Sequence, residues 1–124
     1  MGKARIVAIV GEASVRTVLS TTIETSKDAT AMAVRYLLQM LSDRAPGNTL
    51  EVRVPPYGAV QCVEGPNHTR GTPPNVVEMD AETWIALATG SLEWSAAVAA
   101  NKVSASGSRA SLEELLPIEW NAGQ

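Results

Sequence analysis

The chain has 124 residues, of which 45% are hydrophobic, and it carries a net charge of −3. This length fits one domain with a modest core, and this composition argues against a disordered chain. The net negative charge provides no general attraction to phosphate groups, and the sequence contains no basic patch. We therefore expect no nucleic-acid partner.

The single cysteine, Cys62, cannot form an internal disulfide, which suits a reducing compartment. The apolar run Ile6–Val10 is too short to span a bilayer or to form the core of a signal peptide. We therefore predict a cytoplasmic protein without stable membrane insertion.

The first part of the chain, residues 1–25, supports two interpretations. Ile6–Val10 is rich in β-branched residues, which favours a strand. Its apolar residues also fit one face of a helix, although Gly11 would interrupt that helix. Ala13–Leu19 indicates a short helix. The pattern leaves the choice open.

Residues 27–45 give the clearest helical pattern in the chain. Apolar residues repeat there at helical spacing and form one stripe of a long amphipathic helix. Ser26 or Asp28 can cap its start, and Pro46-Gly47 ends it.

Strands are predicted next. Leu50–Val54 alternates apolar with charged residues, which indicates a strand with one covered face. Tyr57–Val63 follows after Pro55-Pro56 as its antiparallel hairpin partner. The polar stretch 65–75 contains three prolines and is a loop, and Val76–Met79 forms a third strand.

Two helices follow the third strand. Asp80 is the expected N-cap of the first helix, which Gly90 ends. Ser91 is the expected cap of the second, whose Trp94, Ala97 and Val98 would face inward, with Asn101 as a left-handed C-terminal residue.

The last elements are a fourth strand at Lys102–Ser106 and a brief helix. The sequence Ser111–Glu114 has the form of a capping box, in which the serine oxygen accepts from an orphan amide and Glu114 reaches back. Alternating rather than continuous apolar strands favour a mainly antiparallel sheet with one covered face, hence an α+β fold.

Two stretches also resemble a known family. Asp80–Gly90, with its Leu-x-x-Gly ending, and the later Lys-x-x-x-x-Gly run Lys102–Gly107 resemble the C-terminal half of the sterol carrier protein 2 fold. The run Pro55–Asn75 is similar throughout, loop included, to a short actinobacterial branch of bacterial sterol carrier family proteins.

The resemblance covers residues 49–117 and implies a single sterol carrier protein 2-like domain over residues 1–124. It implies a four- to five-stranded sheet with helices on one face and an apolar tunnel between the two layers. It also implies binding of a fatty acid, acyl-coenzyme A or sterol-like lipid, with no catalysis and no cofactor.

The apolar residues of the predicted covered layer have two interpretations. They either line a ligand tunnel or fill an ordinary packed core, and the many alanines of the second helix after the third strand reduce the space available. Ala105 would continue the covered face of the sheet. The candidate lining residues are Leu37, Met40, Val52, Val54, Val60, Cys62, Val77, Met79, Trp84, Leu87, Trp94 and Val98.

His68 and Arg70 lie together on the polar loop. Arg70, assisted by His68, either binds a carboxylate or phosphate head group at the mouth of a pocket or ties the loop to Glu64 or Glu78.

Cys62 and His68 could in principle form a thiolate-histidine pair. Cys62 lies within a strand and is expected to face the core, where thiols are inert, and no oxyanion device is evident. One cysteine and one histidine also cannot complete a zinc site. We therefore expect no catalytic and no metal-binding residues.

The opposite sheet face should be polar, with Glu51, Arg53 and Glu78 among its residues. It is either a solvated face with cross-strand charge pairs or a homodimer or partner interface. The alternative to a lipid carrier is thus an interaction or dimerisation module with a packed core and no ligand.

Overall fold

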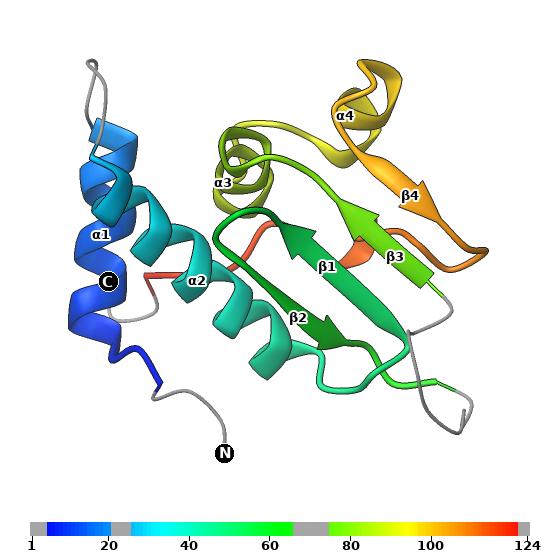
Figure 1. Ribbon diagram of the computed structural model, residues 1–124, viewed down its shortest axis with the longest axis horizontal. Coiled ribbons are helices and arrows are strands. Elements are labelled where there is room, and N and C mark those ends of the chain that lie inside the picture. Colours follow the sequence, from blue (N-terminus) through cyan, green and yellow to red (C-terminus); the bar gives the residue numbers. More distant parts are fainter. Residues whose placement is uncertain (1–4, 21–25, 66–74, 122–124) are drawn as a thin grey trace.

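The computed structural model describes residues 5–20, 26–65 and 75–121. Its centre is a four-stranded sheet in the order β2-β1-β3-β4, with helices on one face (Figure 1). The strands are β1 (Leu50–Val54), β2 (Gly58–Cys62), β3 (Asn75–Glu78) and β4 (Ser104–Ser106). The predicted α+β class is confirmed.

The sheet is mixed rather than antiparallel throughout. β1 pairs antiparallel with β2 and parallel with β3, and β3 pairs antiparallel with β4. The hairpin explains the parallel pair. Since β2 returns the chain to the end of the sheet where β1 begins, β3 can start beside Leu50 and run in the same direction as β1.

The predicted long helix is α2 (Lys27–Arg44). Ser26 rather than Asp28 caps it, because the Ser26 side chain accepts a hydrogen bond from the amide of Ala29. The predicted stripe is buried except for Met40, which is half-buried. The buried residues of α2, which face α1 as well as the core, are Ala33, Val34, Tyr36, Leu37, Leu38 and Leu41.

The N-terminal stretch forms a helix, α1 (Ala8–Ser20), so the strand interpretation of Ile6–Val10 is wrong. Gly11 does not interrupt this helix. It is buried where α1 packs on α2, and a Cβ atom built on it would overlap the ring of Tyr36. The absent side chain thus allows the two helices to approach closely.

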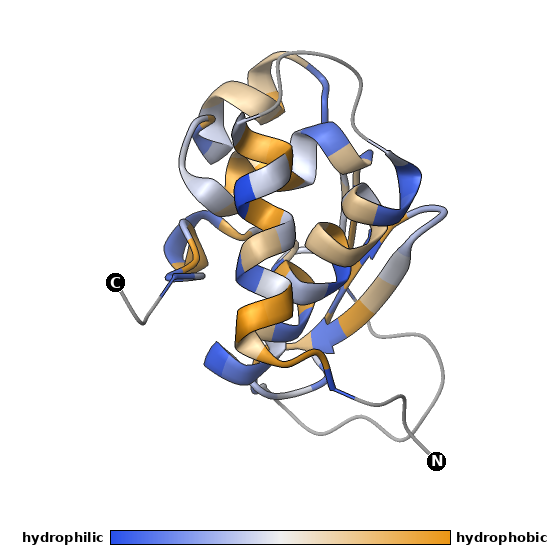
Figure 2. Cartoon of the chain, turned by 90° about the vertical axis from the view of Figure 1, so that its left-hand side faces the viewer, coloured by the Kyte–Doolittle hydropathy of each residue, from blue (hydrophilic) through white to orange (hydrophobic). Residues whose placement is uncertain are grey.

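The ribbon of α1 is mixed in hydropathy, with apolar segments among polar ones (Figure 2). Val7 and Ile9 are 64% and 82% exposed at its start, and Leu19 is 47% exposed near its end. α1 therefore shields α2 but presents apolar side chains of its own to solvent.

α3 (Ala81–Thr89) begins and ends as predicted. The carboxylate of Asp80 accepts a hydrogen bond from the amide of Thr83 at 2.8 Å. Gly90 ends the helix in the left-handed conformation, with φ at +92°, which costs glycine little.

α4 (Trp94–Ala99) departs from the prediction in two ways. Glu93, not Ser91, occupies its N-cap, because the amide and hydroxyl of Ser91 both donate to the carbonyl of Ala86 and complete the end of α3. Only Ala97 of α4 is buried, whereas Val98 is 48% exposed and does not face inward. Asn101 adopts the predicted left-handed conformation, with φ at +63°.

β4 and the segment after it are less regular than predicted. All three β4 residues are exposed, so Ala105 does not extend the covered face. The expected capping-box helix is a single 3-10 turn, Glu113–Leu115, with Leu112 at its N-cap. The Ser111 hydroxyl accepts a hydrogen bond from the amide of Glu113, two residues further on, instead of from that of Glu114.

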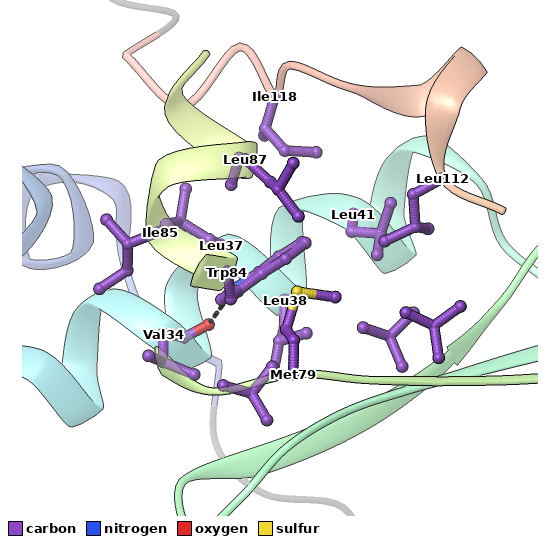
Figure 3. Packing of buried hydrophobic residues seen from close by; sticks show 14 of the residues in the cluster. Val34, Leu37, Leu38, Leu41, Met79, Trp84, Ile85, Leu87, Leu112 and Ile118 are labelled. Atoms are coloured by element: carbon purple, nitrogen blue, oxygen red, sulfur yellow. Dashed lines mark hydrogen bonds between the residues drawn. The ribbon is translucent and has the colours of Figure 1, made fainter. Parts of the chain in front are cut away.

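The core lies between the helices and the covered sheet face, with Trp84 in its middle (Figure 3). The indole of Trp84 has no solvent exposure, and its Nε1 donates to the carbonyl of Val34 at 3.3 Å. Leu112 and Ile118 complete the core from the C-terminal segment, which lies far from α2 in the sequence. Both are buried.

Candidate functional site

The structure brings most of the predicted lining residues into one layer. Met40, Val60 and Trp94 are partly buried against it, and Val98 lies outside it. The residues fully buried in one cluster are Leu37, Val52, Val54, Cys62, Val77, Met79, Trp84 and Leu87.

In this layer the side chains pack against one another around Trp84 (Figure 3). Leu37 from α2, Val52 from β1 and Val77 from β3 are all without solvent exposure. The apolar layer is therefore occupied by protein side chains, and the hollows described next lie at its margins.

The first hollow, which we call the acidic hollow, lies where α3 ends and α4 begins and has a volume of about 280 Å³. Leu87 and Trp94, two predicted lining residues, are part of its wall. Glu93 and Glu113 give it negative charge. The remaining lining residues are Gly90, Leu92, Ser95, Leu116 and Pro117.

The second hollow, the α2–β2 groove, lies along the edge of the sheet between α2 and the β1–β2 hairpin and has a volume of about 590 Å³. Val60 is the predicted lining residue that it contains. Its charged residues are Arg5, Arg35 and Asp43, and its other lining residues are Ile6, Met32, Leu38, Gln39, Ser42, Tyr57, Gly58 and Ala59.

The N-terminal segment forms one wall of this groove. The carboxamide of Gln39 accepts from the amide of Ile6 and donates to its carbonyl, each at 2.9 Å. Arg5 donates two hydrogen bonds to Asp43, at 3.2 and 2.6 Å. These contacts hold residues 5 and 6 against α2.

Arg35 of α2 is held by the hairpin. Its Nε donates to the carbonyl of Tyr57 at 2.8 Å. Since a guanidinium has five N–H donors, this contact leaves most of them available.

Cys62 lies within the buried cluster, as predicted. Burial raises the pKa of its thiol to about 11, so the reactive thiolate is scarce at neutral pH. His68 and Arg70, the predicted mouth of the pocket, lie outside the described residues. Within the described ranges, no group of three or more His, Cys, Asp or Glu residues could hold a metal ion.

The polar sheet face carries the expected charge pairs. The Nε of Arg53 donates to Glu51 at 2.7 Å, and its Nη1 lies 4.0 Å from Glu78 on the neighbouring strand. Both contacts are partly exposed, so they contribute little to stability.

The charged residues of the α2–β2 groove were not predicted from the sequence. No motif links these residues, because Arg5, Arg35 and the Tyr57 that Arg35 contacts are far apart along the chain. The one available signal is that Arg35 interrupts the apolar pattern of α2, which is equally typical of any solvent-facing helix position.

Among the helices of the described part of the chain, none is long and apolar enough to cross a bilayer. A search of curated proteins finds no match.

A comparison with family models matches residues 26–118, described as bacterial SCP ortholog. The match begins at the cap of α2 and ends at Ile118 in the core, so it contains the whole sheet and the apolar layer. It also contains both stretches, Pro55–Asn75 and Asp80–Gly107, on which the resemblance to sterol carrier proteins rests. Since the match spans well over half of the chain, the protein belongs to the family of bacterial SCP orthologs.

Proposed function

We propose that this protein binds and carries an apolar ligand and catalyses no reaction on it. The family suggests a lipid-binding or carrier role. The observation that carries the proposal is the apolar layer itself, which places predicted lining residues from α2, the sheet and α3 in one cluster beside two open hollows. The ligand classes in question are fatty acids, acyl-coenzyme A and sterol-like lipids.

The proposed entry of the ligand is at a margin of the layer. The residues around Trp84 already fill its centre, whereas the two hollows present apolar walls to solvent. Ligand pockets typically combine such apolar walls with a few polar groups. The buried lining residues would then form the support behind the ligand, which would contact Trp94 in the acidic hollow or Val60 in the α2–β2 groove.

The burial and the raised pKa of Cys62 support the proposed absence of catalysis. A thiol with a pKa of about 11 is protonated at neutral pH, and its burial keeps substrates away. We expect iodoacetamide to modify Cys62 in the native protein only at the rate at which the fold opens. Rapid modification of the native protein would contradict this part of the proposal.

The first test is native mass spectrometry of the freshly purified protein, followed by organic extraction of anything bound. An apolar adduct at one copy per chain would support the carrier function and identify the ligand class. A ligand-free mass, together with no binding of added fatty acid or acyl-coenzyme A, would overturn it.

A second candidate function is an interaction or dimerisation module without a ligand. It is favoured by the full burial of the layer around Trp84 and by the Arg53 charge cluster on the uncovered sheet face. Sedimentation of the purified protein distinguishes the two, since a module that dimerises through this face should lose the dimer in Arg53→Glu. A single domain over residues 1–124 and a cytoplasmic location remain predictions.

A further inference from the structure

We propose that the α2–β2 groove is the binding site for a fatty carboxylate, with Arg35 as its head-group residue. This inference rests on the proposed function and makes it specific, because it names the ligand class and the place where it binds.

The groove has the size and surface that a single acyl chain needs. Its volume of about 590 Å³ falls within the range of about 300–1,000 Å³ typical of small-molecule sites. Apolar side chains come from both sides, with Met32 and Leu38 on α2 and Tyr57 and Val60 on the hairpin. Figure 1 shows α2 running beside β2, so these walls extend along the sheet edge.

Arg35 is positioned to receive an anionic head group. Its Nε is committed to the carbonyl of Tyr57, which restricts the side chain without neutralising its charge. Its two Nη groups have no hydrogen-bond partner among the described residues. A guanidinium held in this way offers a pre-ordered pair of donors, and carboxylates bind such pairs with two parallel hydrogen bonds.

The other charges of the groove cancel. Arg5 and Asp43 form a bidentate pair, so neither contributes a net charge to the groove. Arg35 is therefore the one uncompensated charge among its described lining residues. The groove thus carries a local positive charge in a chain whose net charge is −3.

The acidic hollow has the opposite character. Its charged lining residues are Glu93 and Glu113, and the described residues of its wall include no arginine or lysine. These carboxylates would repel the head group of a fatty acid. The acidic hollow therefore disfavours a fatty carboxylate, whereas the α2–β2 groove offers its head group a cationic partner.

The test is titration calorimetry at pH 7 with two probes, dodecanoate and its neutral counterpart dodecanol. The key variant is Arg35→Gln, and Arg44→Gln is the matched control. Arg44 lies on the same helix and also donates to a backbone carbonyl, that of Pro117 at 3.0 Å, but it does not line the groove.

We expect Arg35→Gln to weaken dodecanoate binding roughly tenfold or more, which is the effect of losing a charge-assisted hydrogen bond. Dodecanol binding should remain unchanged in this variant, because the apolar walls are intact. Arg44→Gln should bind both probes as the wild type does. Arg35→Lys keeps the charge but not the paired donors, so its affinity for dodecanoate should lie between those of the wild type and Arg35→Gln.

A second variant tests the walls independently of Arg35. Met32 is partly buried on the groove side of α2. The larger side chain of Met32→Trp should therefore occupy the space of the acyl chain and weaken the binding of both probes. Backbone amide shifts of Gly58–Val60 on adding dodecanoate would report the same contact.

The outcomes separate this inference from the proposed function. If the wild type binds dodecanoate and both Arg35→Gln and Met32→Trp bind it equally well, the groove is not the site, but the carrier function stands. If the wild type binds neither probe and its native mass is free of adducts, the proposed function fails and this inference fails with it.

Discussion

The two ends of the sheet differ in how well a helix covers them. Toward one end, where α2 packs beside β2, Leu50, Val52 and Val54 of the neighbouring strand β1 are buried at every second position. β4 lies at the edge, near the short helix α4, and all of its residues are exposed. Both strands were expected from similar alternating patterns, so the pattern alone did not determine burial.

The difference arises from the amount of apolar surface that each end supplies. α2 buries six residues over eighteen positions, whereas α4 buries only Ala97 over six. Since burial stabilises roughly in proportion to the apolar area removed from water, the α2 end should carry most of the stability. The following substitutions test this contrast, from the largest expected effect to the smallest.

Trp84→Ala should have the largest effect. The indole is fully buried and donates to the carbonyl of Val34, so its removal leaves a cavity and loses one buried hydrogen bond. We expect a loss of about 3–5 kcal/mol in the free energy of unfolding, measured by urea denaturation. Trp94→Ala, at the partly buried α4 end, is the control and should cost clearly less; equal losses would refute the contrast.

Gly11→Val should have the next largest effect. Any Cβ at position 11 overlaps the ring of Tyr36, so α1 must move away from α2. We expect a loss of about 1–3 kcal/mol in the same measurement. Ala13→Val on the exposed side of α1 controls for helix propensity, and the claim fails if the two variants are equally stable.

Asp80→Ala should cost about 1 kcal/mol at pH 7, as expected for the loss of an N-cap. The hydrogen bonds from Thr83 hold the pKa of Asp80 below its ordinary value. A carboxylate with a lowered folded-state pKa stabilises above its unfolded pKa of about 4 and stops doing so as the pH falls through the folded value.

The difference between wild type and Asp80→Ala should therefore shrink below about pH 4. Asp80→Asn is the matched control, because it keeps a capping oxygen without a titrating group. A difference that stays constant with pH would show that the charge of Asp80 is unimportant. Thermal unfolding across this pH range measures both variants.

Val98→Ser should have the smallest effect. Val98 is 48% exposed at the α4 end, so its substitution should change the free energy of unfolding by no more than about 0.5 kcal/mol. A larger loss would mean that the α4 end contributes more than its burial indicates.

Local sequence signals predicted the fold well where a single element contains its own evidence. The apolar stripe of α2, the alternation of β1 and the caps at Ser26, Asp80 and Gly90 all appear in the structure. The errors at Ser91 and Ala105 have one cause. The surroundings of these residues depend on neighbouring elements, since Ser91 is used by the end of α3 and β4 has no covering helix.

The candidate site follows the same division. Its apolar lining could be named from the sequence because strand and helix periodicity determine which residues share a face. The charged residues of the α2–β2 groove could not, because Arg5 reaches Asp43 and Arg35 reaches Tyr57 only after the N-terminal segment, α2 and the hairpin have packed together.

The sequence by itself determined the α+β class, the sterol carrier-like family, the main helix and strand positions and the composition of the core. Only the tertiary structure decided the parallel pairing of β1 with β3, the close approach of α1 at Gly11 and the position of the groove. The physical reason is one of range. Periodicity and capping act within one or two turns of chain, whereas strand order, helix contacts and hollows arise from the packing of distant segments.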